Sequence, residues 1–83
     1  PNPFNPSTRI AFSIPNSSFA SLQVFDILGN KINTLISGEL TEGSYEVEFT
    51  VGQDSSPDIK SGIYFYSIQA ENFKETKKML IIE

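Results

Sequence analysis

Residues 8–14 read "TRIAFSI", and this stretch alternates apolar and polar side chains without interruption. Ile10, Phe12 and Ile14 share one face of an extended chain, because successive side chains of a β-strand point to opposite faces. Residues 44–50, "SYEVEFT", repeat the pattern with an aromatic or aliphatic face and a glutamate face. Both stretches predict β-strands with one buried side and one exposed side.

Two further stretches carry apolar residues on both faces. Residues 21–28 read "SLQVFDIL" and residues 63–69 read "IYFYSIQ". In the first stretch the two faces are occupied by Leu22, Val24 and Leu28 on one side and by Phe25 and Ile27 on the other. Strands of this kind are typical of the middle of a sheet. We therefore expect both stretches to be central strands or strands covered on both faces.

Turn-forming residues separate these apolar stretches. Gly29 and Asn30 tolerate positive φ, so we expect a two-residue turn there, with "KINTLIS" (31–37) as the return strand of a hairpin. Further turn clusters lie at 1–7, 15–18, 38–43, 52–62 and 70–73. Turn signals about every 8–12 residues, with no helical stretch between them, predict an all-β sandwich.

The stretch "DIKSGIYFY" (58–66) indicates the type of sandwich. Asp58, Gly62, Tyr64 and Tyr66 match the start of strand F in immunoglobulin-like domains, where a tyrosine hydroxyl ties the preceding corner to the backbone. Tyr66 stands where antibody domains have a cysteine, and this chain has neither cysteine nor tryptophan. We predict an immunoglobulin-like β-sandwich of about seven antiparallel strands, stabilised by burial of large apolar side chains at about 1.5–3 kcal/mol each.

Length and composition limit the classes of function. The 83 residues make one domain, 1–83, and the initial proline suggests a piece cut or processed from a longer polypeptide. A net charge of −4 without a basic stripe argues against nucleic acid as a partner. The absence of histidine and cysteine removes the common general bases, thiol nucleophiles and soft-metal ligands. We expect no enzyme activity, no metal and no cofactor.

The carboxylates offer two weak alternatives to that expectation. Glu46 and Glu48 are two residues apart on one strand face, which resembles an acid/base pair, but we expect them to be the solvated face of the strand. Asp54 and Asp58, with the serines between them, could offer oxygens to calcium. Their spacing lacks the density of a calcium loop, and a solvated turn is the simpler interpretation.

Two aromatic residues near turns leave a choice between sugar binding and core packing. Phe19 and Phe73 could each stack on a sugar ring. In a small sandwich, however, such residues more often cover the open ends of the core. We favour the second role for both.

The last stretch, "ETKKMLIIE" (75–83), predicts a closing strand. We expect Leu80 and Ile82 to face the core, with Lys78 on the same side near the rim. Lys74, Lys77 and Lys78 are typical of an edge strand, where lysines discourage sheet-to-sheet aggregation.

Five stretches in order resemble a known family. They are "PNPFNPST" (1–8), "LQVFDILGNKINTL" (22–35), "EGSYEVEF" (42–49), "SGIYFYSIQ" (61–69) and "ETKKMLIIE" (75–83). The chain resembles the type A C-terminal sorting domains of the type IX secretion system (Por secretion system), found chiefly in Bacteroidetes and related bacteria. It departs from the family where Phe25 replaces a common tyrosine before Asp26, where Asn30 precedes Lys31 after the glycine, and where residues 51–58 lengthen a loop.

The resemblance implies a sorting signal that carries an upstream cargo domain through the periplasm and outer membrane to the secreted or cell-surface state. The implied partners are the outer-membrane translocon and a sortase-like surface protease. Residues matching the family motif are Pro1, Asn2, Pro3, Phe4, Asp26, Gly29, Gly62 and Tyr64. The resemblance assigns export to Lys77, Lys78, Met79, Leu80, Ile81 and Ile82.

The main alternative is a non-catalytic immunoglobulin-like accessory module that acts as a spacer, a carbohydrate-binding domain or a flagellar hook-capping-like assembly domain. A sorting domain is expected to end its parent protein directly after "KKMLIIE", whereas an internal module should be followed by a linker. Sequence leaves the oligomeric state open, because an exposed edge strand permits strand-to-strand dimerisation.

Overall fold

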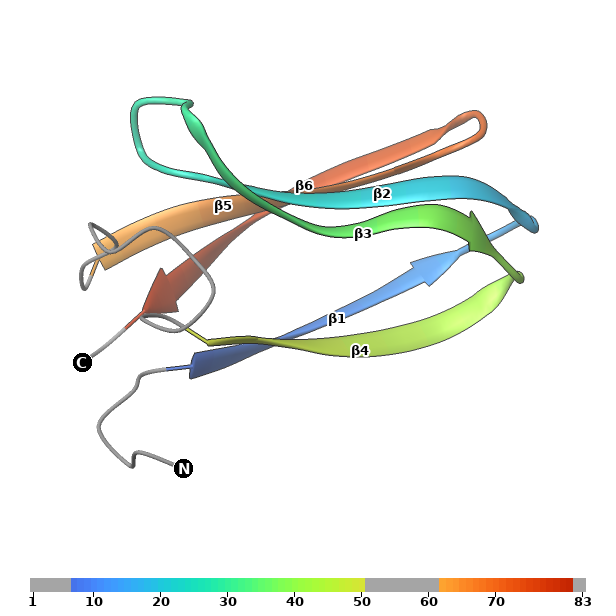
Figure 1. The fold of residues 1–83 in the computed structure, drawn as a ribbon, viewed down its shortest axis with the longest axis horizontal. Coiled ribbons are helices and arrows are strands. Elements are labelled where there is room, and N and C mark those ends of the chain that lie inside the picture. Colours follow the sequence, from blue (N-terminus) through green and yellow to red (C-terminus); the bar gives the residue numbers. More distant parts are fainter. Residues whose placement is uncertain (1–6, 51–61, 82–83) are drawn as a thin grey trace.

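The computed structural model describes residues 7–50 and 62–81, and in these ranges all regular structure is β-strand (Figure 1). The strands are β1 (Ser7–Ile14), β2 (Ser18–Phe25), β3 (Lys31–Leu40), β4 (Gly43–Thr50), β5 (Gly62–Ala70) and β6 (Phe73–Ile81). The prediction of an all-β sandwich is confirmed.

The strands form two antiparallel sheets that lie as separate layers (Figure 1). One sheet pairs β1 with β4, and the other has the order β3-β2-β5-β6. The two stretches with apolar residues on both faces became β2 and β5, and both are central strands as expected. Within the described residues, β3 and β6 are the edges of the larger sheet.

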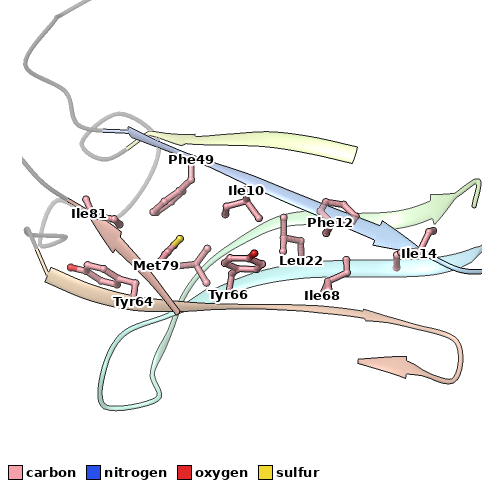
Figure 2. Packing of buried hydrophobic residues seen from close by; sticks show 12 residues of the cluster. Ile10, Phe12, Ile14, Leu22, Phe49, Tyr64, Tyr66, Ile68, Met79 and Ile81 are labelled. Carbon is pink, nitrogen blue, oxygen red and sulfur yellow. The ribbon is translucent and has the colours of Figure 1, made fainter. Parts of the chain in front are cut away.

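The core lies between the two layers (Figure 2). Ile10, Phe12 and Ile14 of β1 are buried and alternate with exposed residues, as their spacing predicts. Leu22 and Ile68, from the central strands of the facing sheet, are fully buried. The remaining buried apolar residues of the core are Ala20, Val24, Phe49, Tyr64, Tyr66, Met79 and Ile81.

Short connections join consecutive strands. The turn between β5 and β6 consists of Glu71 and Asn72, with Asn72 at φ 57°, a left-handed value that asparagine tolerates. The connection between β3 and β4 is residues 41–42, because both strands extend into the cluster 38–43 expected as a turn. Near this end, the Phe12 and Tyr45 rings stack across β1 and β4 at a centroid distance of 5.4 Å, and the Tyr45 hydroxyl donates to the Thr41 carbonyl.

The closing strand faces the core with the opposite residues from those expected. Met79 and Ile81 are buried, whereas Leu80 is 57% exposed and Lys78 lies on the exposed side with it. The cause is the register with β5, in which inward-facing Tyr64 pairs with Met79 and Gly62 pairs with Ile81. Directly opposed residues of an antiparallel pair share a face, so the odd-numbered residues turn inward. Ile82 lies outside the described residues.

Candidate functional site

The connection between β2 and β3 is a five-residue loop, 26–30, in place of the predicted two-residue turn. Phe25 pairs with Lys31, and the loop between them is built around the side chain of Asp26. Asp26 Oδ1 accepts hydrogen bonds from the backbone N–H of Leu28 at 2.9 Å and of Asn30 at 2.8 Å. Asp26 Oδ2 accepts one from the Asn30 side-chain amide at 3.1 Å.

Backbone bonds close the same loop. The Asp26 N–H donates to the Asn30 carbonyl at 2.9 Å, and the Gly29 N–H donates to the Asp26 carbonyl at 3.0 Å. Gly29 has φ +90°, a conformation that a residue with a Cβ adopts only with strain. The loop therefore needs the carboxylate at position 26 and glycine at position 29, two positions of the family motif.

Hydrogen bonding lowers the pKa of Asp26 below its ordinary value of 3.8. The backbone N–H of Asn30 is the main cause, and the Asn30 side chain and the N–H groups of Leu28 and Gly29 add to it. Desolvation acts in the opposite direction but is outweighed. Asp26 is thus a charged structural acceptor within its loop.

Asp26 and its loop lie beside the start of β5. Asp26, Ile27, Gly62, Ile63 and Tyr64 line a 390 Å³ surface hollow, so three family-motif residues from distant parts of the chain meet there. The prediction that Leu28 shares a strand face with Leu22 and Val24 is wrong, because β2 ends at Phe25; Leu28 is 83% exposed and Ile27 is 67% exposed in the loop. In Figure 1 this loop, drawn in turquoise, rises away from the β1–β4 layer.

The adjacent lysines of β6 lie on opposite faces of the strand. Lys77 lines a 490 Å³ groove between the sheets together with Phe12 and Tyr45, and it forms an exposed ion pair with Glu75 at 3.7 Å. Lys78 borders a separate 290 Å³ hollow with Ile63 and Leu80. Lys74, Lys77 and Lys78 are all exposed on an edge strand of the described sheet, as their sequence pattern predicts.

The whole chain, residues 1–83, matches the family model described as "Secretion system C-terminal sorting domain". The chain belongs to this family of sorting domains. Searches of curated proteins and of solved structures found no match. The sorting domain is the C-terminal signal for type IX secretion, and it marks proteins for export across the outer membrane to the secreted or cell-surface state. The accessory-module alternative is not favoured.

The other candidates in the sorting domain have ordinary structural roles where they are described. Glu46 and Glu48 are exposed, as expected: Glu46 pairs with Arg9 at 3.7 Å, and Glu48 Oε2 accepts a hydrogen bond from the Ser7 hydroxyl at 3.0 Å. Across residues 7–50 and 62–81, no group of three or more acidic side chains is placed to hold a metal ion. No helix in this part of the chain is long and apolar enough to cross a bilayer.

The two turn-associated aromatics differ. Phe73 packs against the core, in agreement with the predicted covering role. Phe19 is 56% exposed and lies within β2, so its expected core contact is wrong.

Several predicted residues lie outside the described ranges. They are Pro1, Asn2, Pro3, Phe4, Asp54, Ser55, Ser56, Asp58 and Ile82. Of the proposed strand-F motif, Gly62, Tyr64 and Tyr66 are described and both tyrosines are buried, whereas Asp58 is not described.

Three residues on the face of the larger sheet that points away from β1 and β4 were not candidates in the sequence: Lys31, Ile63 and Phe65. Ile63 and Phe65 belong to the stretch with apolar residues on both faces. That second apolar face was the available signal, and cross-strand register was needed to interpret it.

Proposed function

We propose that this sorting domain is a non-catalytic recognition domain that follows a cargo domain in a larger secreted protein. The outer-membrane translocon binds it during export, and a sortase-like surface protease then acts on the exported protein. The type IX family assignment supports this proposal, because sorting domains are not a known enzyme class and must interact with the secretion machinery. The lack of histidine and cysteine agrees with a role in which this domain breaks no bond.

Recognition includes the terminal region of Lys77, Lys78, Met79, Leu80, Ile81 and Ile82. The observation that carries this step is the position of β6: within the described residues it pairs only with β5, so one edge of its backbone has no strand partner. An unpaired strand edge can bind an extended segment of another protein through main-chain hydrogen bonds. Exposed lysines beside that edge add charge-assisted bonds to carboxylates.

Export of a reporter fusion tests this function. Residues 1–83 are fused after an inert periplasmic protein in a bacterium with a type IX system, and reporter in the medium and at the surface is measured. Removing residues 77–83 also removes core residues Met79 and Ile81, so the informative variant is Lys77→Ser with Lys78→Ser. Lys74→Ser is the matched control on the same strand.

The expected result is export of the parent fusion and of Lys74→Ser, with loss of export for the double variant. An exported parent together with normal export of the double variant contradicts the role of the two lysines. A parent fusion that stays in the periplasm contradicts the sorting function itself.

A further inference from the structure

The outer face of the larger sheet, which points away from the β1–β4 layer, carries an apolar patch at one end. Four residues of the strands form it and two residues of the 26–30 loop border it. We call this set the outer patch: Phe25, Ile63, Phe65 and Leu80, bordered by Ile27 and Leu28. Ile63 and Leu80 are opposed across β5 and β6, and Phe25 and Phe65 are opposed across β2 and β5.

One cross-strand row gives the outer patch its charge. Lys31 of β3 pairs with Phe25, Phe25 pairs with Phe65, and Phe65 pairs with Lys78 of β6. The row therefore crosses the sheet with a lysine at each end and two phenylalanines between them. Both lysines are exposed, and within residues 7–50 and 62–81 neither forms an ion pair.

Between the outer patch and the exposed Phe19 near the start of β2, the outer face is polar. The next row places Gln23 opposite Ser67 and Ser67 opposite Thr76, whose hydroxyl donates to the Ser67 hydroxyl at 3.3 Å. The following row places Gln69 of β5 between Ser21 of β2 and Lys74 of β6. Apolar side chains are thus concentrated at the end of the face where the 26–30 loop, the start of β5 and the end of β6 meet.

The outer patch is accessible. Ile63 is 42% exposed and Leu80 is 57% exposed, while Phe25 and Phe65 are partly buried. The two hollows of 390 and 290 Å³ both include Ile63 in their walls, so the surface next to this residue is concave in two places. Contiguous exposed apolar surface with a polar border is characteristic of protein interaction sites.

We propose that the outer patch is a docking surface for a protein of the type IX machinery whose contacting surface is apolar and carries carboxylates at its margins. This inference rests on the proposed function. The charge of this surface indicates a partner with acidic groups. The domain has a net charge of −4, and yet Lys31 and Lys78 flank its apolar surface. The nearby Asp26 carboxylate is already held by the N–H groups of its own loop.

A second copy of the domain fits the same surface less well. Two copies stacked face to face and aligned along the row would place lysines opposite lysines, which costs free energy. A partner with acidic groups at the corresponding positions would instead pair with both lysines.

The decisive variants are Lys31→Glu and Ile63→Ser, because neither residue belongs to the terminal region and both are exposed. Lys74→Glu repeats the charge change at the polar end of the face, and Phe19→Ser removes an exposed aromatic side chain at the far end of β2. We expect Lys31→Glu and Ile63→Ser to lower export of the reporter fusion about tenfold or more, as for loss of a close charge pair or an apolar anchor. The two controls should export like the parent, and urea midpoints of all four domains should stay close to the parent value.

Contact is tested separately with a photo-crosslinking amino acid at position 63 or at position 19. The expected result is a crosslink from position 63, but not from position 19, to a translocon subunit identified by mass spectrometry. A crosslink from position 63 to a second copy of the domain overturns the proposal, and so does the absence of any translocon crosslink during active export.

The export data also separate the two proposals. If Lys77→Ser with Lys78→Ser blocks export while Lys31→Glu and Ile63→Ser are exported normally, the terminal recognition stands and the outer patch is not a docking surface. If the parent fusion is not exported, the proposed function fails and the outer patch proposal fails with it.

Discussion

Truncating Ile81 and truncating Leu80 should have very different effects on stability, although the residues are adjacent. Ile81 is 1% exposed and lies in the core with Phe49 and Tyr64, whereas Leu80 is 57% exposed on the outer face (Figure 2). Ile81→Ala removes buried methyl and methylene groups and leaves a cavity. Leu80→Ala removes side-chain atoms that are largely in contact with water.

The expected magnitudes follow from this difference in burial. Ile81→Ala should lower the free energy of unfolding by about 2–5 kcal/mol, a large part of the total of about 4–12 kcal/mol expected for a domain of this size. Leu80→Ala should lower it by less than about 1 kcal/mol. Because about 1 kcal/mol shifts Tm by roughly 4–8 °C in a small domain, Ile81→Ala should lower Tm by at least about 8 °C.

The assay is urea unfolding of the isolated domain, followed by tyrosine fluorescence and far-UV circular dichroism, since the chain has three tyrosines and no tryptophan. Ile81→Val, expected to cost about 0.5–1.5 kcal/mol, keeps the comparison measurable if Ile81→Ala does not fold. A larger loss for Leu80→Ala would show that β6 turns its even-numbered residues inward, and equal losses would show that Leu80 and Ile81 do not differ in burial; either result contradicts the structure. In the first case the register between β5 and β6 would differ from the one in which Tyr64 pairs with Met79.

Three further predictions concern the 26–30 loop and the two turn-associated aromatics, Phe19 and Phe73. Gly29→Ala should destabilise the domain by about 1 kcal/mol because of the φ of +90°, whereas Gly38→Ala, in open space within β3, should be neutral or slightly stabilising; urea midpoints distinguish them. The pKa of Asp26 is lower in the folded state than its ordinary value of 3.8. The loss of unfolding free energy in Asp26→Asn should therefore be greatest above pH 3.8 and should vanish as the pH falls through the folded pKa. Unfolding curves of both proteins from about pH 7 to about pH 2 measure this, and a loss that does not change with pH would contradict it. Phe73→Ala should lower the midpoint clearly more than Phe19→Ala, because only Phe73 packs on the core; equal effects would refute the assignment.

Alternation of side chains was sufficient to predict the sandwich and much of its core. The inward face of β1 is correct residue by residue, and so is the central position of β2 and β5. These predictions succeeded because burial of one strand face imposes a period of two on the sequence itself. The family motifs likewise identified the sorting domain without any structure.

The 26–30 loop could not be predicted from turn propensity alone. Glycine followed by asparagine is a common signal for a two-residue turn, and this signal does not include the side chain of Asp26. The carboxylate accepts three hydrogen bonds from within the loop, and these bonds favour a longer connection that exposes Ile27 and Leu28. Local side-chain to backbone bonding of this kind competes with the regular hairpin.

The inward face of β6 was ambiguous for a different reason. "MLII" has four consecutive apolar residues, so alternation cannot show which two are buried. Pairing with β5 resolves the ambiguity, because Tyr64 and Tyr66 face the core and their partners on β6 must share that face. This information is a contact between distant segments and is absent from the local pattern.

Along β6, buried and exposed residues alternate between positions 78 and 81, so the residues that stabilise the fold differ from those available for recognition. Met79 and Ile81 anchor β6 to the core, while Lys78 and Leu80 face outward beside Ile63. A deletion of the whole terminal motif therefore changes folding and surface together, and its effect on export cannot be assigned to either. Substitutions at Lys78 and Leu80 alter only the exposed face, so they report on binding by the secretion machinery, whereas substitutions at Met79 and Ile81 report first on stability.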